Sequence, residues 1–448
     1  MTFEQQRIKE LEEEVAMLKL QVKYLISEIE KLKHPKNSNN SSLPPSKDDN
    51  RINKSRSLRT SSGKNIGGQQ GHEGNTLTMT DTPDEIIEHK PHYCNHCGKD
   101  LTGIVSKEEM RRQVVDIPPI IPQYIEHRIF SCECSCGHIT ESSFPIGVNA
   151  PISYGSNIES VIAYLHTRQF LPFDRMREYF SDVCNLSIST GAISDILKRF
   201  SEKALSSYEV IAGKVKNSFV IGGDETGAKV NGKRGWFWAW QSKMATFITF
   251  SNNRGKNTID VSFPDGFPKS IFVHDCWKSH FDTIAMRHQL CTSHLLRELK
   301  YFEERYKSLW ATKFKQLLLD ALKLKESLVP TDYLQPISKR IDFENSLGRL
   351  LVSVIPENMK EVITFQKRMI KYRNYIFTFL YFQDVPPDNN ASERAIRNIK
   401  VKQKVSGQFK TANGAQTYAI IRSITDTCIK NKQNILAAFK TIANLQPE

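Results

Sequence analysis

Two aspartates in this sequence stand where a carboxylate could bind a metal ion. Asp224 closely follows the apolar residues 219–221, and Asp275 closely follows residues 271–273. If both runs are strands, each acid lies at the carboxyl edge of a sheet, where open α/β sheets keep their sites. Two neighbouring carboxylates repel each other unless a cation lies between them, and oxygen ligands suit Mg²⁺ or Mn²⁺. The pattern predicts a divalent-metal site.

Glu393 is the third candidate ligand, and it begins a predicted helix in the segment DNNASERAIRNIKVKQK. The alternative is a capping box, with Asn390 as the N-cap and Glu393 three positions later. The same helical face continues with Arg397, Lys400 and Lys404, which a cap does not explain. A carboxylate followed by three cations suits a metal ligand on a helix that also contacts phosphates. We therefore predict Glu393 as a ligand and the three cations as DNA-binding residues.

Three such carboxylates fit phosphodiester chemistry with two metal ions. Ions about 3.5–4 Å apart activate the attacking oxygen and stabilise the leaving oxygen of an in-line displacement. Asp224 would bridge both ions, while Asp275 and Glu393 would each complete one. Glu225 points to the opposite face if its strand continues, so we leave it out of the ligand set.

The residues around these acids predict a mixed sheet with helices packed on it. Three antiparallel strands come first, with an Asn231-Gly232 hairpin turn between the first two. Two more strands follow, separated by helices. The five predicted strands are SFVIGGDET, the segment after Gly232 with Trp236, Trp238 and Trp240 at period two, ATFITFS, KSIFVHD and RHQLCTSH. Residues 295–382 are strongly helical and look like an insertion, and 390–443 are helical around a break at Ser406-Gly407 and Gly414.

A cluster of cysteines lies upstream, in residues 81–148. Cys94 and Cys97 form a C-x-x-C followed by glycine, as in a zinc knuckle, and Cys136-Gly137 repeats that ending. The companion of Cys136 is Cys134 or Cys132, and the spacing does not decide between them. The alternative is a set of buried free thiols, but about 60 residues have too little core without a metal. We predict a zinc ribbon with a structural Zn²⁺, whose strands include the strand-like sequence RRQVVDIPPIIPQYIEHRIF between the two halves. The chosen ligand set is Cys94, Cys97, Cys134 and Cys136.

The first 33 residues carry the most regular apolar pattern in the chain. Apolar residues alternate at spacings of three and four, with a β-branched residue at every a position and leucine at every d position. They are Ile8, Leu11, Val15, Leu18, Val22, Leu25, Ile29 and Leu32. This arrangement favours a parallel two-stranded coiled coil and hence a homodimer. The alternative is one amphipathic helix lying on the body of the protein, but the polar sequence after Pro35 leaves little for it to lie on.

Two further segments are candidates for contact with DNA. Residues 34–80 read as a flexible linker with a basic arm, which could follow a DNA backbone or serve only as a solvated connection. Its cations are Arg51, Lys54, Arg56, Arg59 and Lys64. Residues 150–210 read as a helical DNA-binding region that resembles a helix-turn-helix, with Thr190 as the cap of a second helix that buries Ile193, Leu197 and Phe200. An ordinary helical hairpin is the alternative.

The bulk composition agrees with a nucleic-acid partner. The 448 residues carry a formal net charge of +13, with a sequence pI near 9.2, which favours a polyanionic partner. No apolar run approaches the roughly 20 residues of a membrane span. The N-terminus lacks the features of a signal peptide, so we expect a cytoplasmic protein without membrane contact.

Taken in order, these motifs resemble a family, the DDE transposases of insertion sequences, and in particular the large transposase of the insertion-sequence-sixty-six type. The matching features are the zipper, KNSNNSSLPPS, GGQQGHEG, the cysteine ribbon, GGDET, FVHDCWKSHF, CTSHLLRE and NNASERAIRNIKVKQKVSGQF. The resemblance implies a multidomain α/β protein with an RNase-H-like catalytic core over residues 215–448 and a helical insertion at about 295–385. It also implies Asp224, Asp275 and Glu393 as the catalytic triad.

The resemblance further implies that His294 and Arg297 lie near the site. The expected activity is metal-dependent cleavage and strand transfer of double-stranded DNA at the ends of an insertion sequence, with accessory proteins of the same element as candidate partners. Two other functions fit the residues. One is a catalytically inactive DNA-binding protein derived from such an enzyme, which would predict a broken triad. The other is a metal-dependent DNA nuclease that cuts without joining.

Overall fold

The computed structural model describes residues 3–37, 40–41, 48, 77–145, 147–148 and 150–445. The chain divides into two compact units, Met1–Arg51 with Pro122–Glu448 and Ile52–Ile121. The basic residues predicted for the arm lie outside the described residues, as does GGQQGHEG. In the described part of the chain, no helix is long and apolar enough to cross a membrane.

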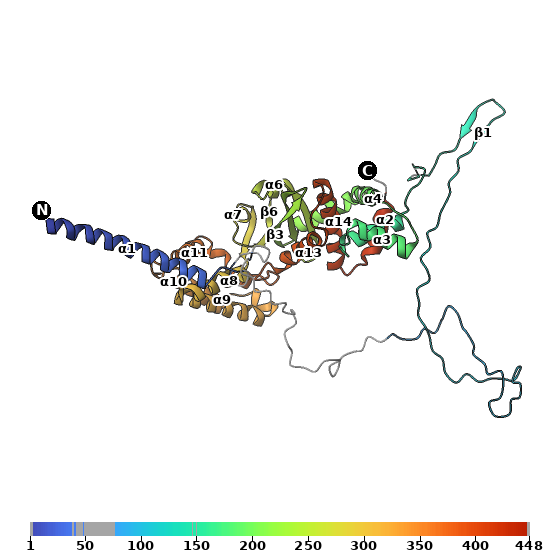
Figure 1. Ribbon diagram of the computed structural model, residues 1–448, viewed down its shortest axis with the longest axis horizontal. Coiled ribbons are helices and arrows are strands. Elements are labelled where there is room, and N and C mark those ends of the chain that lie inside the picture. Colours follow the sequence, from blue (N-terminus) through green and yellow to red (C-terminus); the bar gives the residue numbers. More distant parts are fainter. Residues whose placement is uncertain are drawn as a thin grey trace. The chain divides into compact units, whose positions relative to one another are not determined.

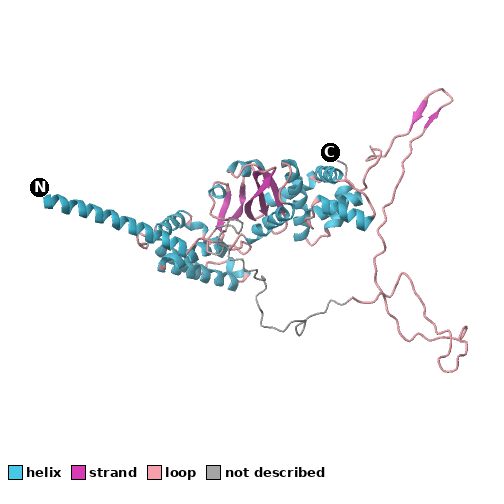
Figure 2. Cartoon of the chain, viewed as in Figure 1, coloured by secondary structure: helices cyan, strands magenta, loops and turns pink. Residues whose placement is uncertain are grey.

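A mixed sheet forms the centre of the larger unit (Figure 2). Its five strands lie in the order β5-β4-β3-β6-β7. The strands are β3 (Val220–Val230), β4 (Lys233–Gln241), β5 (Thr246–Ser251), β6 (Phe267–His274) and β7 (Ala285–Leu290). Strands β3, β4 and β5 are antiparallel neighbours, whereas β6 and β7 run parallel to β3. The five predicted strands are thereby confirmed.

The turn between β3 and β4 is the predicted two-residue hairpin. Asn231 and Gly232 both have positive φ, at 46° and 73°. This is the backbone of a type I′ turn, whose twist matches that of the two strands it joins. The turn sets a register in which Glu225 lies opposite Trp238 and Gly227 opposite Trp236.

Helices cover both faces of the sheet. Trp238, Trp240 and Phe247 pack with the helices of residues 156–216, with α14 (Ala412–Lys430) and with α15 (Ile435–Ala443). Phe237 and Ala239, on the opposite face, pack against α13 (Asn390–Ser406) and the start of α14. Figure 1 shows α13 and α14 beside the strands. Two short helices, α6 (Lys256–Ser262) and α7 (Lys278–Phe281), lie in the connections around β6.

The predicted helical region contains α2 (Ser156–Thr167), α3 (Phe173–Cys184), α4 (Thr190–Lys203) and α5 (Leu205–Lys216). As predicted, α4 buries Ile193, Leu197 and Phe200. The predicted cap is wrong by one position, because the Ser189 hydroxyl accepts the N–H of Ala192. Adjacent hydroxyl residues are equivalent cap candidates in the sequence, and the local backbone selects one of them. These helices share one apolar core with the sheet.

The predicted insertion is helical throughout and has an apolar core of its own. It consists of α8 (Thr292–Tyr306), α9 (Leu309–Ser327), α10 (Ser338–Val352), α11 (Lys360–Lys371) and α12 (Thr378–Tyr381), with 3₁₀ turns η2 (Pro330–Tyr333) and η3 (Arg373–Tyr375). Ile271, Val273 and Leu290 of the sheet join this core. After the insertion, the break between α13 and α14 falls at Gly407, whereas Gly414 lies inside the first turn of α14.

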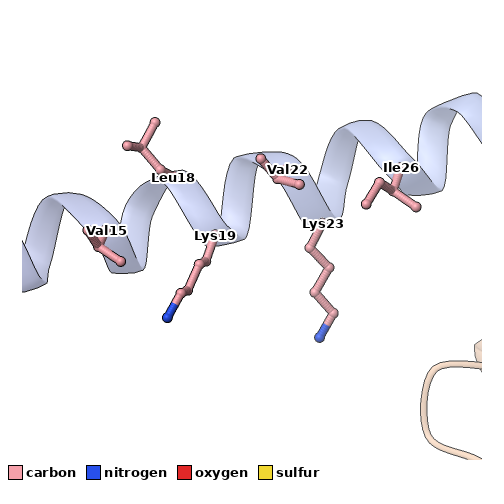
Figure 3. A pocket seen from close by; sticks show the side chains of 6 residues that line it. All are labelled: Val15, Leu18, Lys19, Val22, Lys23 and Ile26. Atoms are coloured by element: carbon pink, nitrogen blue, oxygen red, sulfur yellow. The ribbon is translucent and has the colours of Figure 1, made fainter.

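The N-terminal helix α1 (Phe3–Lys33) leaves its apolar seam uncovered. The seam residues Ile8, Leu11, Val15, Leu18, Val22, Leu25, Ile29 and Leu32 are between 44% and 80% exposed. Val15, Leu18, Val22 and Ile26 line an apolar groove on this helix, and Lys19 and Lys23 point away from Leu18 (Figure 3). Within the described residues, the body of the protein therefore does not cover this seam of α1.

The residues directly after α1 are held more firmly than a flexible linker predicts. Lys36 Nζ lies 2.6 Å from Glu361 Oε1 of α11, and Asn40 Nδ2 donates to Glu304 Oε2 of α8 at 3.0 Å. Asn40 is only 3% exposed. These polar contacts explain the order of this short segment, since it buries little apolar surface.

Lys402 of α13 is a buried amine that no carboxylate contacts among the described residues. Its ammonium donates to Leu171 O at 2.9 Å and lies 3.1 Å from His166 Nδ1. Burial lowers the pKa of Lys402 from its ordinary 10.5 to about 7. Burial and the charge of Lys402 also lower the pKa of His166, which keeps that imidazole neutral.

We expect the contribution of Lys402 to the free energy of unfolding to rise with pH between about 7 and 10. In that range the unfolded chain keeps the Lys402 proton that the folded protein releases, and one proton corresponds to about 1.4 kcal/mol per pH unit. Lys402→Met should flatten this slope in urea unfolding at pH 7, 8 and 9. Lys430, with a pKa lowered to about 8 by burial, keeps some slope in the variant. Parallel curves for both proteins would contradict the assignment to Lys402.

Candidate active site

The pairing register of β3 with β6 brings Asp224 and Asp275 together. Val220, Ile221 and Gly222 of β3 pair with Ile271, Phe272 and Val273 of β6. Continuing that register by two residues places Asp224 beside Asp275, which directly follows β6. Contrary to the predicted strand end, β3 continues past Asp224 to Val230, because β4 still pairs with it after β6 has ended. Asp224 thus lies at the edge of the parallel part of the sheet.

Helix α13 lies directly against β3 because Gly222 leaves room for it. A Cβ at Gly222 would come within 2.5 Å of Ser392 Oγ and 2.9 Å of Asn389 Oδ1. Asn389, just before α13, donates from Nδ2 to Gly223 O at 2.7 Å and accepts from Ser392 Oγ at 2.6 Å. The first glycine of GGDET, Gly222, therefore allows a close approach that brings Glu393 to the aspartates.

Glu393 is not part of the predicted alternative, a capping box. The N-cap is Asn389 rather than Asn390, and no side chain forms the cap hydrogen bond. Glu393 Oε1 instead lies 3.6 Å from Arg297 Nη2 and 3.8 Å from His294 Nδ1, both on α8. The residues that the resemblance placed near the site thus lie directly beside Glu393.

The charges around Asp224 indicate where a cation would bind. Burial, followed by the charges of Glu225, Asp275 and Glu393, raises the pKa of Asp224 well above its ordinary value. A buried carboxylate whose ionisation is disfavoured by neighbouring carboxylates is stabilised when a divalent cation lies among them. An all-oxygen donor set is also the one that Mg²⁺ and Mn²⁺ prefer. The three predicted residues therefore fit such a metal.

Asp275 is held by two donors. Its Oδ1 accepts the backbone N–H of Trp277 at 3.0 Å and lies 3.1 Å from His280 Nδ1. Burial opposes ionisation, but the hydrogen bond and charge of His280 outweigh it and hold the pKa of Asp275 well below its ordinary value. Asp275 therefore ionises more readily than Asp224.

Glu225 has a different set of neighbours from Asp224. As the pleat of a continuing strand requires, successive side chains point to opposite faces. Glu225 Oε1 accepts from Arg254 Nε at 2.9 Å and Nη2 at 2.7 Å. This pairing agrees with leaving Glu225 out of the ligand set.

Among the described residues, two groups have potential ligand atoms that lie within 4.8 Å of one another, His274 with Asp275 and His280, and Cys291 with His294 and Glu393. Burial raises the pKa of the Cys291 thiol to about 12, and its sulfur accepts the N–H of Asn389 at 3.2 Å. A thiol that stays protonated is a poor metal ligand, since thiolates bind metals. The carboxylate site therefore fits a metal better than the group that contains Cys291 does.

The three cations predicted to bind DNA differ in their surroundings. Arg397 and Lys404 are exposed on α13. Lys400 is half-buried, and its ammonium donates to the carbonyl of Gly227 in β3. Burial and the charge of Arg234 lower the pKa of Lys400. Arg397 and Lys404 are thus open to a phosphate, whereas Lys400 already has an acceptor.

The predicted zinc ligands form two similar turns in different compact units. Gly98 N donates to Cys94 O at 2.9 Å, and Gly137 N donates to Cys134 O at 2.8 Å. Both glycines have positive φ, at 70° and 82°. Strands β1 (Ser131–Glu133) and β2 (Ile139–Glu141) flank the second turn. The N–H of Cys136 donates to the Cys134 thiol and lowers its pKa, so the Cys134 sulfur lies close to Cys136 in this turn.

The stretch expected to form ribbon strands between the two halves does not do so. Residues 111–130 contain no strand. Pro118, Pro119 and Pro122 lack the backbone N–H that a β-ladder requires. The apolar side chains here, such as Val114 and Ile117, are exposed.

Two residues of the site were not found from the sequence. Asn389 holds the helix that carries Glu393, and Arg254 contacts Glu225. Trp277 and His280 had a signal, because they follow Asp275 in FVHDCWKSHF, where the family that the sequence resembles tends to carry an aromatic or polar pair, with packing as the alternative role. Arg254 had none, since it is an ordinary loop cation whose partner is 29 residues away.

Comparison with known proteins agrees with this geometry. Residues 151–417, more than half of the chain, match the family model described as "Transposase IS66 family". All three acids lie within the matched residues. Residues 2–78 match a model described as "Family of unknown function (DUF6444)". A comparison with curated proteins gave no match.

Proposed function

Because this chain belongs to the IS66 transposase family, we propose that it cuts and joins DNA strands at the ends of an insertion sequence. The observation that carries the proposal is the convergence of Asp224, Asp275 and Glu393 from β3, the end of β6 and α13. The five-stranded mixed sheet with helices on it is consistent with an RNase-H-like DDE core. The intact set of acids favours an enzyme over an inactive DNA-binding derivative.

Family membership implies a divalent metal, and Asp224, Asp275 and Glu393 are the residues that would hold Mg²⁺ or Mn²⁺. Such ions activate an attacking oxygen and stabilise a leaving one. The chain's own residues prepare the site: Trp277 and His280 orient Asp275, and Asn389 fixes α13 against β3. Arg297, beside Glu393, can approach a phosphate at the same place.

The reaction has two steps at one site. Water first attacks a phosphodiester at the element end, which breaks one strand and leaves a 3′-hydroxyl. That hydroxyl then attacks a phosphodiester of the target DNA, forming a new bond while the target's own 3′-oxygen leaves. A nuclease would stop after the first step.

The family implies DNA binding, and the surface of the chain supplies candidate contacts. Arg397 and Lys404 extend from Glu393 along α13 and are exposed. The net charge of +13 favours phosphate contacts throughout. The helices α3 and α4 remain the candidates for reading the element ends.

We further propose that α1 pairs two subunits, so that two ends are handled together. An exposed heptad seam is stable in water only when another apolar surface covers it. We expect Leu18→Glu to raise the dimer dissociation constant at least about a hundredfold. Each buried leucine contributes about 1.5–3 kcal/mol, and the dimer loses two. Sedimentation velocity of the full chain measures this change.

Leu20→Glu is the matched control, because Leu20 is 69% exposed and lies outside the seam. It should leave the dimer intact. If Leu18→Glu and the wild type have the same mass in solution, the seam is not the dimer interface.

A structural Zn²⁺ is the second proposed metal. The two turns support it, because backbone N–H groups of Cys97 and Cys136 lower the pKa of the Cys94 and Cys134 thiols, and a metal binds thiolates. Cys134 rather than Cys132 is the proposed companion of Cys136.

Strand joining is the experiment that tests the proposed function. Labelled element-end duplex and a target plasmid are incubated with the full chain and Mg²⁺. A covalent product between label and plasmid supports a transposase. Nicked duplex without joined product favours a nuclease, and binding without either product favours an inactive DNA-binding protein.

A further inference from the structure

We propose that His280 is a positioning residue that holds the Asp275 carboxylate in its metal-binding orientation, and that Glu225 holds His280. The inference rests on the proposed function, because it concerns a residue behind the proposed metal site. It assigns a role to two buried side chains that the three-carboxylate site itself does not use.

His280 lies between two carboxylates. Its side chain is fully buried, with Nδ1 3.1 Å from Asp275 Oδ1 and Nε2 3.5 Å from Glu225 Oε2. The ring also packs edge-on against Trp238 and Trp277, with centroids 6.1 Å and 5.3 Å away. The imidazole is thus oriented by contacts on several sides.

The contact between His280 and Glu225 gives a partner to two buried polar atoms that otherwise have none. Glu225 Oε2 and His280 Nε2 are buried and make no hydrogen bond among the described residues. They face each other 3.5 Å apart, and a small movement closes an N–H···O bond between them. Buried polar atoms without partners are costly, so this pairing is favoured over leaving both unsatisfied.

Glu225 is itself held in place by Arg254, a residue nearer the surface. Arg254 binds Glu225 Oε1 through two nitrogens. Its guanidinium lies over the rings of Trp236 and Trp277, 4.8 Å and 4.6 Å from their centroids. A line of contacts therefore runs from Arg254 through Glu225 and His280 to Asp275.

At Asp275 these contacts engage one oxygen only. Both donors, the Trp277 N–H and His280 Nδ1, approach Oδ1, which leaves Oδ2 for a metal. Replacing a residue that hydrogen-bonds to a metal ligand and orients it lowers metal affinity or activity by roughly 10–100-fold. We expect His280 to have an effect of this size.

Two substitutions of His280 separate orientation from packing. In His280→Asn the amide nitrogen takes the place of Nδ1 and still reaches Asp275. In His280→Gln it takes the place of Nε2 and reaches only Glu225. Mn²⁺ affinity, measured by electron paramagnetic resonance on the full chain with element-end duplex, should fall about 10–100-fold in His280→Gln. The Mn²⁺ affinity of His280→Asn should stay closer to that of the wild type. A role in packing alone would predict the reverse order, because glutamine fills the space of histidine better than asparagine does.

The role of Glu225 is tested in both backgrounds. Glu225→Ala should weaken Mn²⁺ binding in the wild type and add little in His280→Asn, whose side chain no longer reaches position 225. Asp426→Ala is the matched control, since it removes another buried carboxylate that faces an arginine, Arg422. It should lower the melting temperature without changing Mn²⁺ affinity.

The outcomes distinguish this inference from the proposed function. Equal Mn²⁺ affinities in wild type and His280→Gln, or weaker binding in His280→Asn than in His280→Gln, overturn the positioning role alone. Additive losses in the double variant overturn the link to Glu225. Wild type that binds no Mn²⁺ overturns both proposals. Wild type that joins no DNA, while His280→Gln still binds Mn²⁺ more weakly, overturns only the proposed reaction.

Discussion

Glu393→Gln is expected to lower the rate of strand cleavage about a thousandfold or more and to leave DNA affinity nearly unchanged. The charge stabilisation provided by a bound metal is worth several kcal/mol, and about 1.4 kcal/mol corresponds to a factor of ten in rate. Glutamine keeps the size of the side chain and its place beside His294 and Arg297, but it offers one neutral oxygen in place of a carboxylate. The loss should therefore be confined to chemistry.

Single-turnover cleavage of labelled element-end duplex measures the rate, and fluorescence anisotropy measures DNA binding. Glu303→Gln is the matched control, because Glu303 lies in α8, the helix that carries His294 and Arg297, and pairs with Lys315 rather than with the site. It should cleave at the wild-type rate. Cleavage by Glu393→Gln at the wild-type rate would exclude Glu393 as a ligand.

Gly222→Ala is expected to reduce cleavage about a hundredfold and to destabilise the fold by about 1–3 kcal/mol. The added methyl group would lie 2.5 Å from Ser392 Oγ, 2.6 Å from Gln241 Nε2 and 2.9 Å from Asn389 Oδ1. To make room, α13 must move away from β3, and the bond from Asn389 to Gly223 O is strained or lost. Glu393 moves with the helix, so the three carboxylates separate.

Gly348→Ala is the matched control for this change. Gly348 lies inside α10, and a Cβ there meets no atom within 4 Å. Alanine should stabilise that helix by about 0.5–1 kcal/mol and leave cleavage unchanged. Chemical unfolding and single-turnover cleavage are compared for both variants. Wild-type cleavage by Gly222→Ala would show that the approach of α13 to β3 does not position Glu393.

The elements of this protein were largely predictable because each rests on a local pattern. Period two at Trp236, Trp238 and Trp240 predicts β4, and Asn231-Gly232 predicts the turn before it. The spacing of Ile8 to Leu32 predicts α1. Errors occurred where two neighbouring residues are chemically equivalent, as at the Ser189 cap. Another error fell on apolar sequence without a partner strand, in residues 111–130.

The chemical type of the site was also present in the sequence. Two apolar runs that lead into acids, together with an acid at the start of a basic helix, predicted Asp224, Asp275 and Glu393. The structure brings these residues together by continuing the register of β3 and β6 and by seating α13 on Gly222. The sequence carried this information because ligand type and strand or helix position are properties of short segments.

Only the tertiary structure decided which side chains support the acids. Arg254 and Glu225 are 29 positions apart, and Asn389 and Gly223 are 166 apart. It also decided that Lys400 binds the Gly227 carbonyl while Arg397 stays exposed. Periodicity and turn chemistry act over a few residues, so the sequence determined the elements and the kind of chemistry. Contacts such as His280 with Glu225 depend on strand register and on packing between distant segments, and these exist only once the chain has folded.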